Sequence, residues 1–167
     1  DIIKILPSIV DEHNNVRFVF SGSPTVKRII GQLDREIQQC NVEFIGWFSE
    51  ESKWEMYSSA DILLLPSYNE GLPYVIIEAL ASGLPIISTD VGGIPEVIEN
   101  GQNGYIIKSG DVNALRRHII ELLKDYNLRK KISISNWEKA RNDYSLHENI
   151  RLINRIYDDM AHINENT

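Results

Sequence analysis

Five short apolar runs alternate with stretches of helical periodicity along this chain, and this alternation constrains the fold more than any other feature. The runs cover residues 16–20, 42–45, 62–65, 85–88 and 105–107. Strands that alternate with helices form a parallel sheet. The runs are mostly continuous rather than alternating, which is typical of strands covered by helices on both faces. The sequence therefore predicts an α/β fold, a doubly wound (Rossmann-like) parallel sheet with helices on both faces and further helices at the C-terminal end.

Local signals predict where the helices begin and end. We expect helices over residues 1–10, from Ser23, from Ser49, from Pro73, from Asp111, over residues 128–142 and from Ser145. Ser49 and Asp111 can each accept a hydrogen bond from the first turn of a helix. Gly83, followed by Pro85, ends the helix that begins at Pro73.

Composition limits the partners of this chain. At 167 residues and 43% hydrophobic content, it is long enough for one domain with a buried core. Its 17 basic and 24 acidic side chains give a formal net charge of −7, without a basic block beside aromatic residues. We therefore expect no contact with nucleic acid or with a membrane surface. The apolar runs are also far shorter than the roughly 20 residues of a membrane-spanning helix.

The cysteine and histidine content argues against metal chemistry. Cys40 is the single cysteine, so it cannot form a disulfide within the chain, and it has no Cys or His at metal-ligand spacing. We expect a reducing, cytoplasmic location from this. The histidines share no spacing with acids that would suggest a metal site or a catalytic triad; they are His13, His118, His147 and His162.

Ligands bind an open parallel sheet at the carboxyl ends of its strands, so the loops after the apolar runs are candidate sites. The turn at residues 21–24 contains Gly22, which would let the backbone approach a ligand, although small residues also serve packing alone. After the second run, Trp47, Phe48 and Ser49 could form a wall for a planar base. Aromatic residues are also ordinary core filler, so both interpretations stay open.

The third loop carries the strongest signal, because Glu70 and Glu78 stand eight positions apart around a Gly-x-Pro turn. Pro73 would start a helix whose free N–H groups attract an anion such as a diphosphate. Glu78 would lie roughly 7 to 8 Å along that helix, at about 1.5 Å per residue, and could accept hydrogen bonds from ribose hydroxyls. Glu70 would lie on the sugar side of the phosphates.

An ordinary structural interpretation of the two glutamates competes with this one. Glu70 could be a solvated loop residue, and Glu78 could be a core acid paired with Lys or Arg, since an unpaired carboxylate in an apolar run is costly to bury. The spacing around Gly-x-Pro favours the functional interpretation. The turn at Gly92 and Gly93 could line the same cleft, whereas the Asn-Gly pairs at Asn100 and Asn103 are typical of turns into the last strand.

Taken together, these residues resemble the donor-binding C-terminal domain of the family 4 retaining glycosyltransferases, which have the two-domain GT-B architecture. The resemblance spans nearly the whole chain. Its strongest part is residues 70–81, which match the Glu-x7-Glu motif of that family. Further matches in the same order are residues 44–47, 60–67, 83–87, 92–96 and 103–105.

The resemblance implies roles for the expected site residues. Glu70 would be the catalytic residue, in contact with the transferred sugar, and Glu78 would bind the nucleoside ribose. Backbone around Gly71, Leu72 and Tyr74 would hold the diphosphate. The loop of Trp47, Phe48 and Ser49 would hold the base, with the turn at Gly22 beside the donor. The substrate would be a UDP-sugar or a GDP-sugar, and transfer would proceed with retention at the anomeric carbon, without a cofactor or a bound metal.

We further expect residues 1–167 to be one domain of a two-domain enzyme. In the family, a first strand, a Gly-Arg turn, a Lys that neutralises the diphosphate and the acceptor-binding domain would precede Asp1. This chain alone would then bind nucleotide without catalysing transfer. The full-length protein would use a sugar or lipid-linked acceptor in cell-surface polysaccharide synthesis, and it could be peripheral at the inner face of the membrane. The alternatives are a nucleotide-sugar epimerase or hydrolase of the same fold and a non-enzymatic flavodoxin-like binding module.

Overall fold

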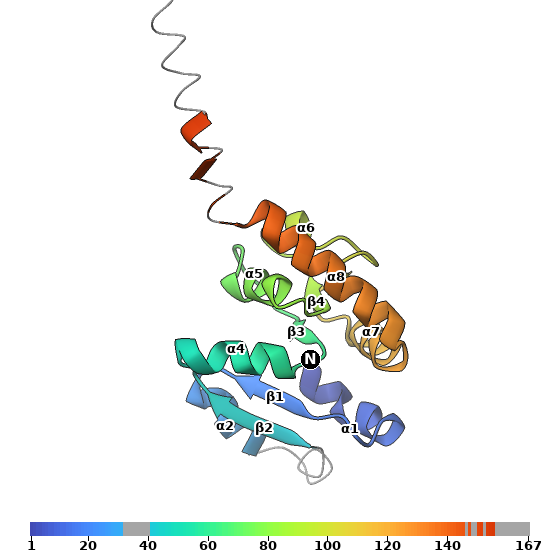
Figure 1. Cartoon of the computed structure of the whole chain (residues 1–167). Coiled ribbons are helices and arrows are strands. Elements are labelled where there is room, and N and C mark those ends of the chain that lie inside the picture. The colour runs from blue at the N-terminus through green and yellow to red at the C-terminus, as the bar shows by residue number, and fades with distance from the viewer. Residues whose placement is uncertain (32–40, 146, 148–149, 152, 156–167) are drawn as a thin grey trace, which may run out of the picture.

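The computed structural model describes residues 1–31, 41–145, 147, 150–151 and 153–155. Within these ranges the chain is an α/β protein with parallel strands, as predicted (Figure 1). Cys40 and most of the helix expected from Ser145 lie outside the described residues.

Helices and strands alternate along the chain as far as α7, and each of the predicted apolar runs overlaps a strand. In order, the elements are α1 (Ile2–Glu12), β1 (Phe18–Ser21), α2 (Pro24–Gly31), β2 (Val42–Gly46), α4 (Glu50–Ser59), β3 (Leu63–Leu65), α5 (Tyr74–Ala81), β4 (Ile86–Thr89), α6 (Ile94–Val97), β5 (Gly104–Ile107), α7 (Val112–Lys124) and α8 (Tyr126–Asp143).

The strands are parallel, as predicted, and form two hydrogen-bonded groups. β1 pairs with β2, and β3, β4 and β5 pair in that order, with every pairing parallel. In the part of the chain that the structure describes, no ladder joins β1 to β3. The three leucines of β3 are only half-buried, although they are fully apolar. Among the described residues, β1 and β3 each have one edge without a strand paired to it.

Two clusters of buried side chains form the core. One joins α1 and α7 to β1, β4 and β5, with Leu6, Ile9 and Leu115 fully buried. The other surrounds α5, where Ile76 and Leu80 are fully buried. α4 lies between the β1–β2 pair and α5 (Figure 1). This arrangement puts α4 next to the helix that carries Glu78.

The predicted helix ends are confirmed by hydrogen bonds and backbone angles. Ser49 Oγ accepts a hydrogen bond from the Ser52 backbone N–H at 3.2 Å, and Asp111 Oδ1 accepts one from Ala114 at 2.9 Å. Gly83 ends α5 with a φ of 72°, a conformation that favours glycine. These local signals fix where α4, α5 and α7 lie along the chain.

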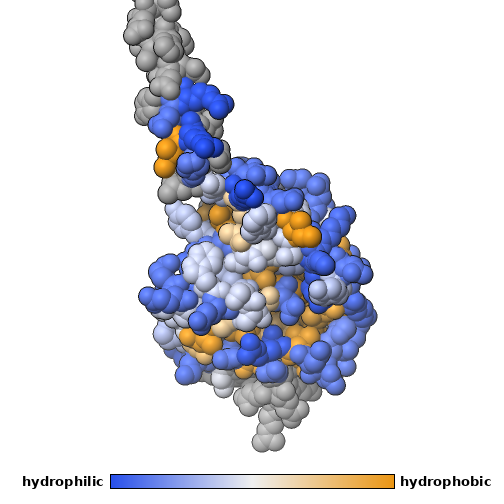
Figure 2. All heavy atoms as spheres, in the orientation of Figure 1, coloured by the Kyte–Doolittle hydropathy of each residue, from blue (hydrophilic) through white to orange (hydrophobic). Residues whose placement is uncertain are grey.

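Hydrophilic side chains cover most of the face shown in Figure 2, with separate apolar patches near its middle. None of the described helices combines the length and the apolar character needed to cross a membrane.

Candidate functional site

The loop between β3 and α5 is anchored to the ends of the neighbouring strands. Ser88 Oγ donates a hydrogen bond to the Leu65 carbonyl at 2.8 Å, and Thr89 Oγ1 donates one to the Ser67 carbonyl at 2.6 Å. Both hydroxyl residues are fully buried. Because buried hydrogen bonds of this kind are costly to break, they hold the loop at the carboxyl ends of β3 and β4.

Glu70 lies in this loop and is held by it. Ser67 Oγ donates a hydrogen bond to Glu70 Oε1 at 2.8 Å, and the residue is half-buried. Glu70 is therefore not the freely solvated loop residue of the structural interpretation, because one of its oxygens has a fixed partner.

The paired glycines between β4 and α6 pack directly against the backbone of this loop. Gly93 N–H donates to the Gly71 carbonyl at 2.7 Å. A Cβ atom on Gly92 would lie 2.2 Å from the Glu70 carbonyl oxygen and 2.3 Å from that of Gly71. Gly92 also has a φ of 55°. Only glycine fits at position 92. The turn at Gly92 and Gly93, which was expected to line the cleft, therefore packs against the backbone of Glu70 and supports it.

α5 begins beside Glu70 without a side-chain cap. Its N-cap is Pro73, which makes no side-chain hydrogen bond to the first turn. Gly71 and Leu72 are exposed, and Tyr74 is 85% exposed. The first N–H groups of a helix lack partners within the helix and attract anions. The three residues expected at the diphosphate therefore lie together at an accessible helix start.

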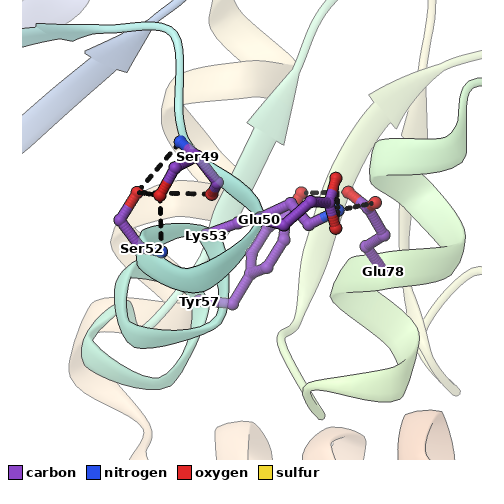
Figure 3. Close-up of polar contacts among 6 residues, drawn as sticks. All are labelled: Ser49, Glu50, Ser52, Lys53, Tyr57 and Glu78. Atoms are coloured by element: carbon purple, nitrogen blue, oxygen red, sulfur yellow. Dashed lines mark hydrogen bonds and ion pairs between the residues drawn. The ribbon is translucent and has the colours of Figure 1, made fainter.

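Glu78, one turn further along α5, meets two donors from α4 (Figure 3). Lys53 Nζ lies 2.7 Å from Glu78 Oε1, and Tyr57 OH donates to Glu78 Oε2 at 2.9 Å. The Lys53 ammonium also lies 3.1 Å from Glu50. Glu78 thus has the lysine partner of the structural interpretation, yet 26% of its side chain stays exposed.

Both donors are in their protonated forms at neutral pH. The hydrogen bonds to Glu78 and Glu50 raise the pKa of Lys53 above its ordinary value. Burial, together with the hydrogen bond to Glu78, raises the pKa of Tyr57 far above its ordinary value. Glu78 therefore faces one positive charge and one neutral hydroxyl donor.

The candidate base loop lies at the carboxyl ends of β1 and β2. Gly22 N–H donates to the Gly46 carbonyl at 2.9 Å, which brings the turn at Gly22 beside the loop of Trp47, Phe48 and Ser49. Trp47 is 76% exposed, so it is not core filler.

Next to this loop the structure has an open pocket of about 460 Å³. Its lining residues are Ile45, Trp47, Phe48, Ser52, Glu55, Met56 and Ser59.

The structure thus brings the expected site residues together in two groups. One is the turn at Gly22 with the base loop, and the other extends from Glu70 to Glu78. The pocket at the base loop is lined by neither Glu70 nor Glu78. α4 connects the groups, because it is capped by Ser49 and carries the side chains that contact Glu78.

Several side chains of the site were not found from the sequence. Ser67 and Thr89 hold the loop of Glu70, and Lys53 and Tyr57 hold Glu78. The partners of Glu78 are 25 and 21 residues away along the chain, so no local pattern identifies them. Across the described ranges, no group of three or more His, Cys, Asp or Glu side chains is placed to hold a metal ion.

Comparisons with known proteins match most of the chain. The family described as "Glycosyl transferases group 1" matches residues 1–139. The N-acetyl-alpha-D-glucosaminyl L-malate synthase of Bacillus anthracis is 32% identical over 90% of this chain and 38% of its own length. The capsular polysaccharide biosynthesis glycosyltransferase CapM of Staphylococcus aureus is 29% identical over 87% of this chain and 38% of its own length. The chain therefore spans less than half the length of these curated relatives.

Solved structures show the same fold. The C-terminal domain of the group 1 glycosyl transferase LpcC from Francisella tularensis superimposes with a TM-score of 0.76, at 22% identity, over 87% of this chain and 78% of that domain. Anabaena Alr3699/HepE in complex with UDP gives a TM-score of 0.79, at 21% identity, over 93% of this chain and 44% of that protein. A second structure of HepE holds UDP-glucose.

The motif-based resemblance and these comparisons agree. Since the family match covers well over half of the chain, this protein belongs to the group 1 glycosyl transferases, the family 4 retaining enzymes, and has the fold of the C-terminal domain of the GT-B architecture.

Proposed function

We propose that this chain is the donor-binding half of a retaining glycosyltransferase that moves a sugar from a nucleoside diphosphate sugar to an acceptor. One observation carries the proposal: the uncapped, exposed start of α5 lies between Glu70, in the preceding loop, and Glu78, one turn along the helix. A diphosphate at the helix start would have an acid available on each side for sugar hydroxyls.

The diphosphate is recognised by the backbone in this proposal. A formal net charge of −7 disfavours an anionic ligand at long range. The free N–H groups at the start of α5 supply a local positive potential that does not depend on basic side chains. The exposed and uncapped start of α5 is therefore suited to two phosphates.

Glu70 acts at the reacting sugar. When the bond between sugar and diphosphate breaks, positive charge develops at the anomeric carbon and negative charge on the leaving phosphate. The helix start stabilises the leaving diphosphate, and fixed dipoles of this kind act without reorganisation in the transition state. The hydrogen bond from Ser67 and the packing of Gly92 against its backbone carbonyl support this role, because they hold Glu70 in the loop that precedes the helix start.

The base and the ribose take the other side of the helix start. Glu78 accepts hydrogen bonds from ribose hydroxyls, and the exposed Trp47 offers its ring to the base. UDP is our first choice of nucleotide, because the similar HepE was solved in complex with UDP and with UDP-glucose. The turn at Gly22, joined to the base loop by a hydrogen bond, completes this end of the site.

We also propose that a strand from a preceding part of the full-length protein completes the sheet. The order β2–β1 followed by β3–β4–β5 fits the doubly wound order 3-2-1-4-5-6 if one strand lies between β1 and β3. The three leucines of β3 are only half-buried, which is consistent with an added strand next to β3. In the full-length protein, the free edges of β1 and β3 should then be protected from hydrogen exchange; rapid exchange there would contradict the added strand.

The preceding part would also carry the basic residues for the diphosphate and the domain that binds the acceptor. We therefore expect this chain to bind nucleotide without catalysing transfer by itself. The similarity to CapM, whose name refers to capsular polysaccharide, supports an acceptor in cell-surface polysaccharide synthesis. The proposal keeps the cytoplasmic location expected from the single cysteine.

Calorimetry of the 167-residue chain with UDP, GDP and ADP tests the donor role. We expect one nucleotide to bind, with weak affinity. Glu78→Ala should weaken it by about 1 to 3 kcal/mol, the cost of losing hydrogen bonds to a charged acceptor. Glu99→Ala, which removes an exposed acid outside the site, is the control and should bind as wild type does. If none of the three nucleotides binds, the donor role is wrong.

Turnover of the full-length protein separates transfer from the other reactions of the fold. Consumption of the donor that depends on an acceptor supports a transferase. Rapid epimerisation or stoichiometric hydrolysis of the donor without acceptor would support the epimerase or hydrolase instead.

A further inference from the structure

We propose that Lys53 and Tyr57 are positioning residues that hold the Glu78 carboxylate in one orientation and so set how strongly this domain selects for ribose hydroxyls. This inference rests on the proposed function, because it concerns how the same site recognises its nucleotide. Neither side chain belongs to the Glu-x7-Glu motif, and both come from a different helix (Figure 3).

The contacts are divided evenly over the carboxylate. Lys53 binds Oε1 at 2.7 Å and Tyr57 binds Oε2 at 2.9 Å, so each oxygen has one protein donor. An ionised carboxylate has about four acceptor positions. Two positions therefore remain for a ligand, and 26% of the Glu78 side chain is exposed. Two neighbouring ribose hydroxyls are a matching pair of donors.

The two donors, Lys53 and Tyr57, lie on a helix with a well-defined start. Lys53 and Tyr57 stand four residues apart, on the same face of α4. A capping box fixes the start of this helix: Ser52 N–H donates to Ser49 Oγ at 3.2 Å, and Ser49 N–H donates to Ser52 Oγ at 3.1 Å. The side chain of Tyr57 is buried, and Lys53 is only 16% exposed. Both donors to Glu78 therefore come from a capped helix and are largely buried.

The same helix links ribose recognition to base recognition. The base loop ends at Ser49, and Lys53 lies one turn further along α4. A base on Trp47 and a ribose on Glu78 would then be held at a spacing that α4 fixes. Preorganised contacts of this kind improve selectivity, because the ligand does not have to order the groups that it binds.

A purely structural ion pair between α4 and α5 would behave differently. Its loss would lower stability, and affinity for every nucleotide would fall together. A positioning role predicts instead that the preference for a ribose hydroxyl falls. The ratio of affinities for UDP and 2′-deoxy-UDP measures that preference, and GDP with 2′-deoxy-GDP serves as the second pair if the chain selects guanine.

The chain offers a close control for Tyr57. Tyr105 is equally buried, at 8% exposure, and its hydroxyl also donates to a glutamate, Glu121 Oε1, at 3.0 Å. Tyr105 and Glu121 lie outside the site. Tyr57→Phe and Tyr105→Phe therefore remove the same kind of hydrogen bond, and thermal unfolding should show similar losses of stability for both.

We expect wild type and Tyr105→Phe to bind UDP about tenfold more tightly than 2′-deoxy-UDP, which corresponds to about 1.4 kcal/mol. In Tyr57→Phe this ratio should fall to about threefold or less. Lys53→Met should lower the ratio as well and gives the answer if Tyr57→Phe does not fold. Weak affinities of this kind are measurable by calorimetry or by NMR titration of the 167-residue chain.

Each other outcome has a definite meaning. If wild type binds no nucleotide, the proposed function fails and this inference fails with it. If wild type binds UDP and 2′-deoxy-UDP equally, or if both site variants keep the tenfold ratio, this inference is wrong while nucleotide binding stands.

Discussion

Replacing Gly92 by alanine should destabilise the protein, because the added Cβ would meet the backbone of the loop that carries Glu70. The added Cβ would lie 2.2 Å from the Glu70 carbonyl oxygen and 2.3 Å from the Gly71 carbonyl oxygen. An ordinary carbon–oxygen contact is at least 3.4 Å. The backbone of the loop therefore has to move by about 1 Å, and overpacking of this size costs about 1 to 3 kcal/mol.

The positive φ of Gly92 adds a second cost. A residue with a Cβ atom in this conformation loses about 1 to 2 kcal/mol relative to glycine. Gly92→Ala should therefore lower the free energy of unfolding by about 2 to 5 kcal/mol in total. Gly101→Ala isolates the backbone part, because Gly101 has a φ of 75° and nothing lies within 4 Å of its added Cβ.

Urea unfolding of wild type, Gly92→Ala and Gly101→Ala measures both terms. The difference between the two variants, about 1 to 3 kcal/mol, is the contribution of the contact with the loop of Glu70. If both variants lose the same stability within about 0.5 kcal/mol, the turn at Gly92 does not hold that loop and the reasoning is refuted.

Three further changes test other parts of the structure. Asn103→Ala should cost about 2 to 4 kcal/mol in urea unfolding, because this buried side chain bonds Glu99 N–H and the Val97 carbonyl; a loss under about 0.5 kcal/mol would contradict this. The hydrogen bond from Lys124 lowers the pKa of Glu12, so Glu12 stabilises the fold above its ordinary pKa of 4.5, and this stabilisation is lost as the pH falls through the lowered pKa. The stability difference between wild type and Glu12→Gln should therefore shrink from about pH 6 to about pH 3. A difference that stays constant over this range would show that the ionised Glu12 carboxylate does not stabilise the fold. Trp47→Ala should change stability by less than about 0.5 kcal/mol, since the ring is exposed, yet weaken nucleotide binding in calorimetry; unchanged affinity would remove Trp47 from the base site.

Local features of the sequence predicted the elements well. Apolar runs found the strands, and Ser49, Asp111 and Gly83 marked helix ends that the structure confirms. These signals succeed because a cap or a positive φ acts within a few residues of the chain. The loop and helix from Glu70 to Glu78 were located in the same way.

Local features of the sequence could not predict contacts between segments that are distant along the chain. The sequence allowed a lysine or arginine partner for Glu78 but could not name Lys53, because nothing local joins α4 to α5. The turn at Gly92 was expected near the cleft, yet its fit against the Glu70 carbonyl depends on how two loops approach. The sequence also did not specify which strands pair, since apolar runs do not encode strand order.

The central claim is that the start of α5 receives a nucleoside diphosphate. An NMR titration of the ¹⁵N-labelled chain with UDP tests it most directly, because each backbone N–H reports separately. The largest shifts should fall on Gly71, Leu72 and Tyr74, with smaller shifts at Trp47. If UDP at high concentration leaves the amides of Gly71, Leu72 and Tyr74 unmoved, or shifts only amides far from α5 such as those of α8, the account is contradicted.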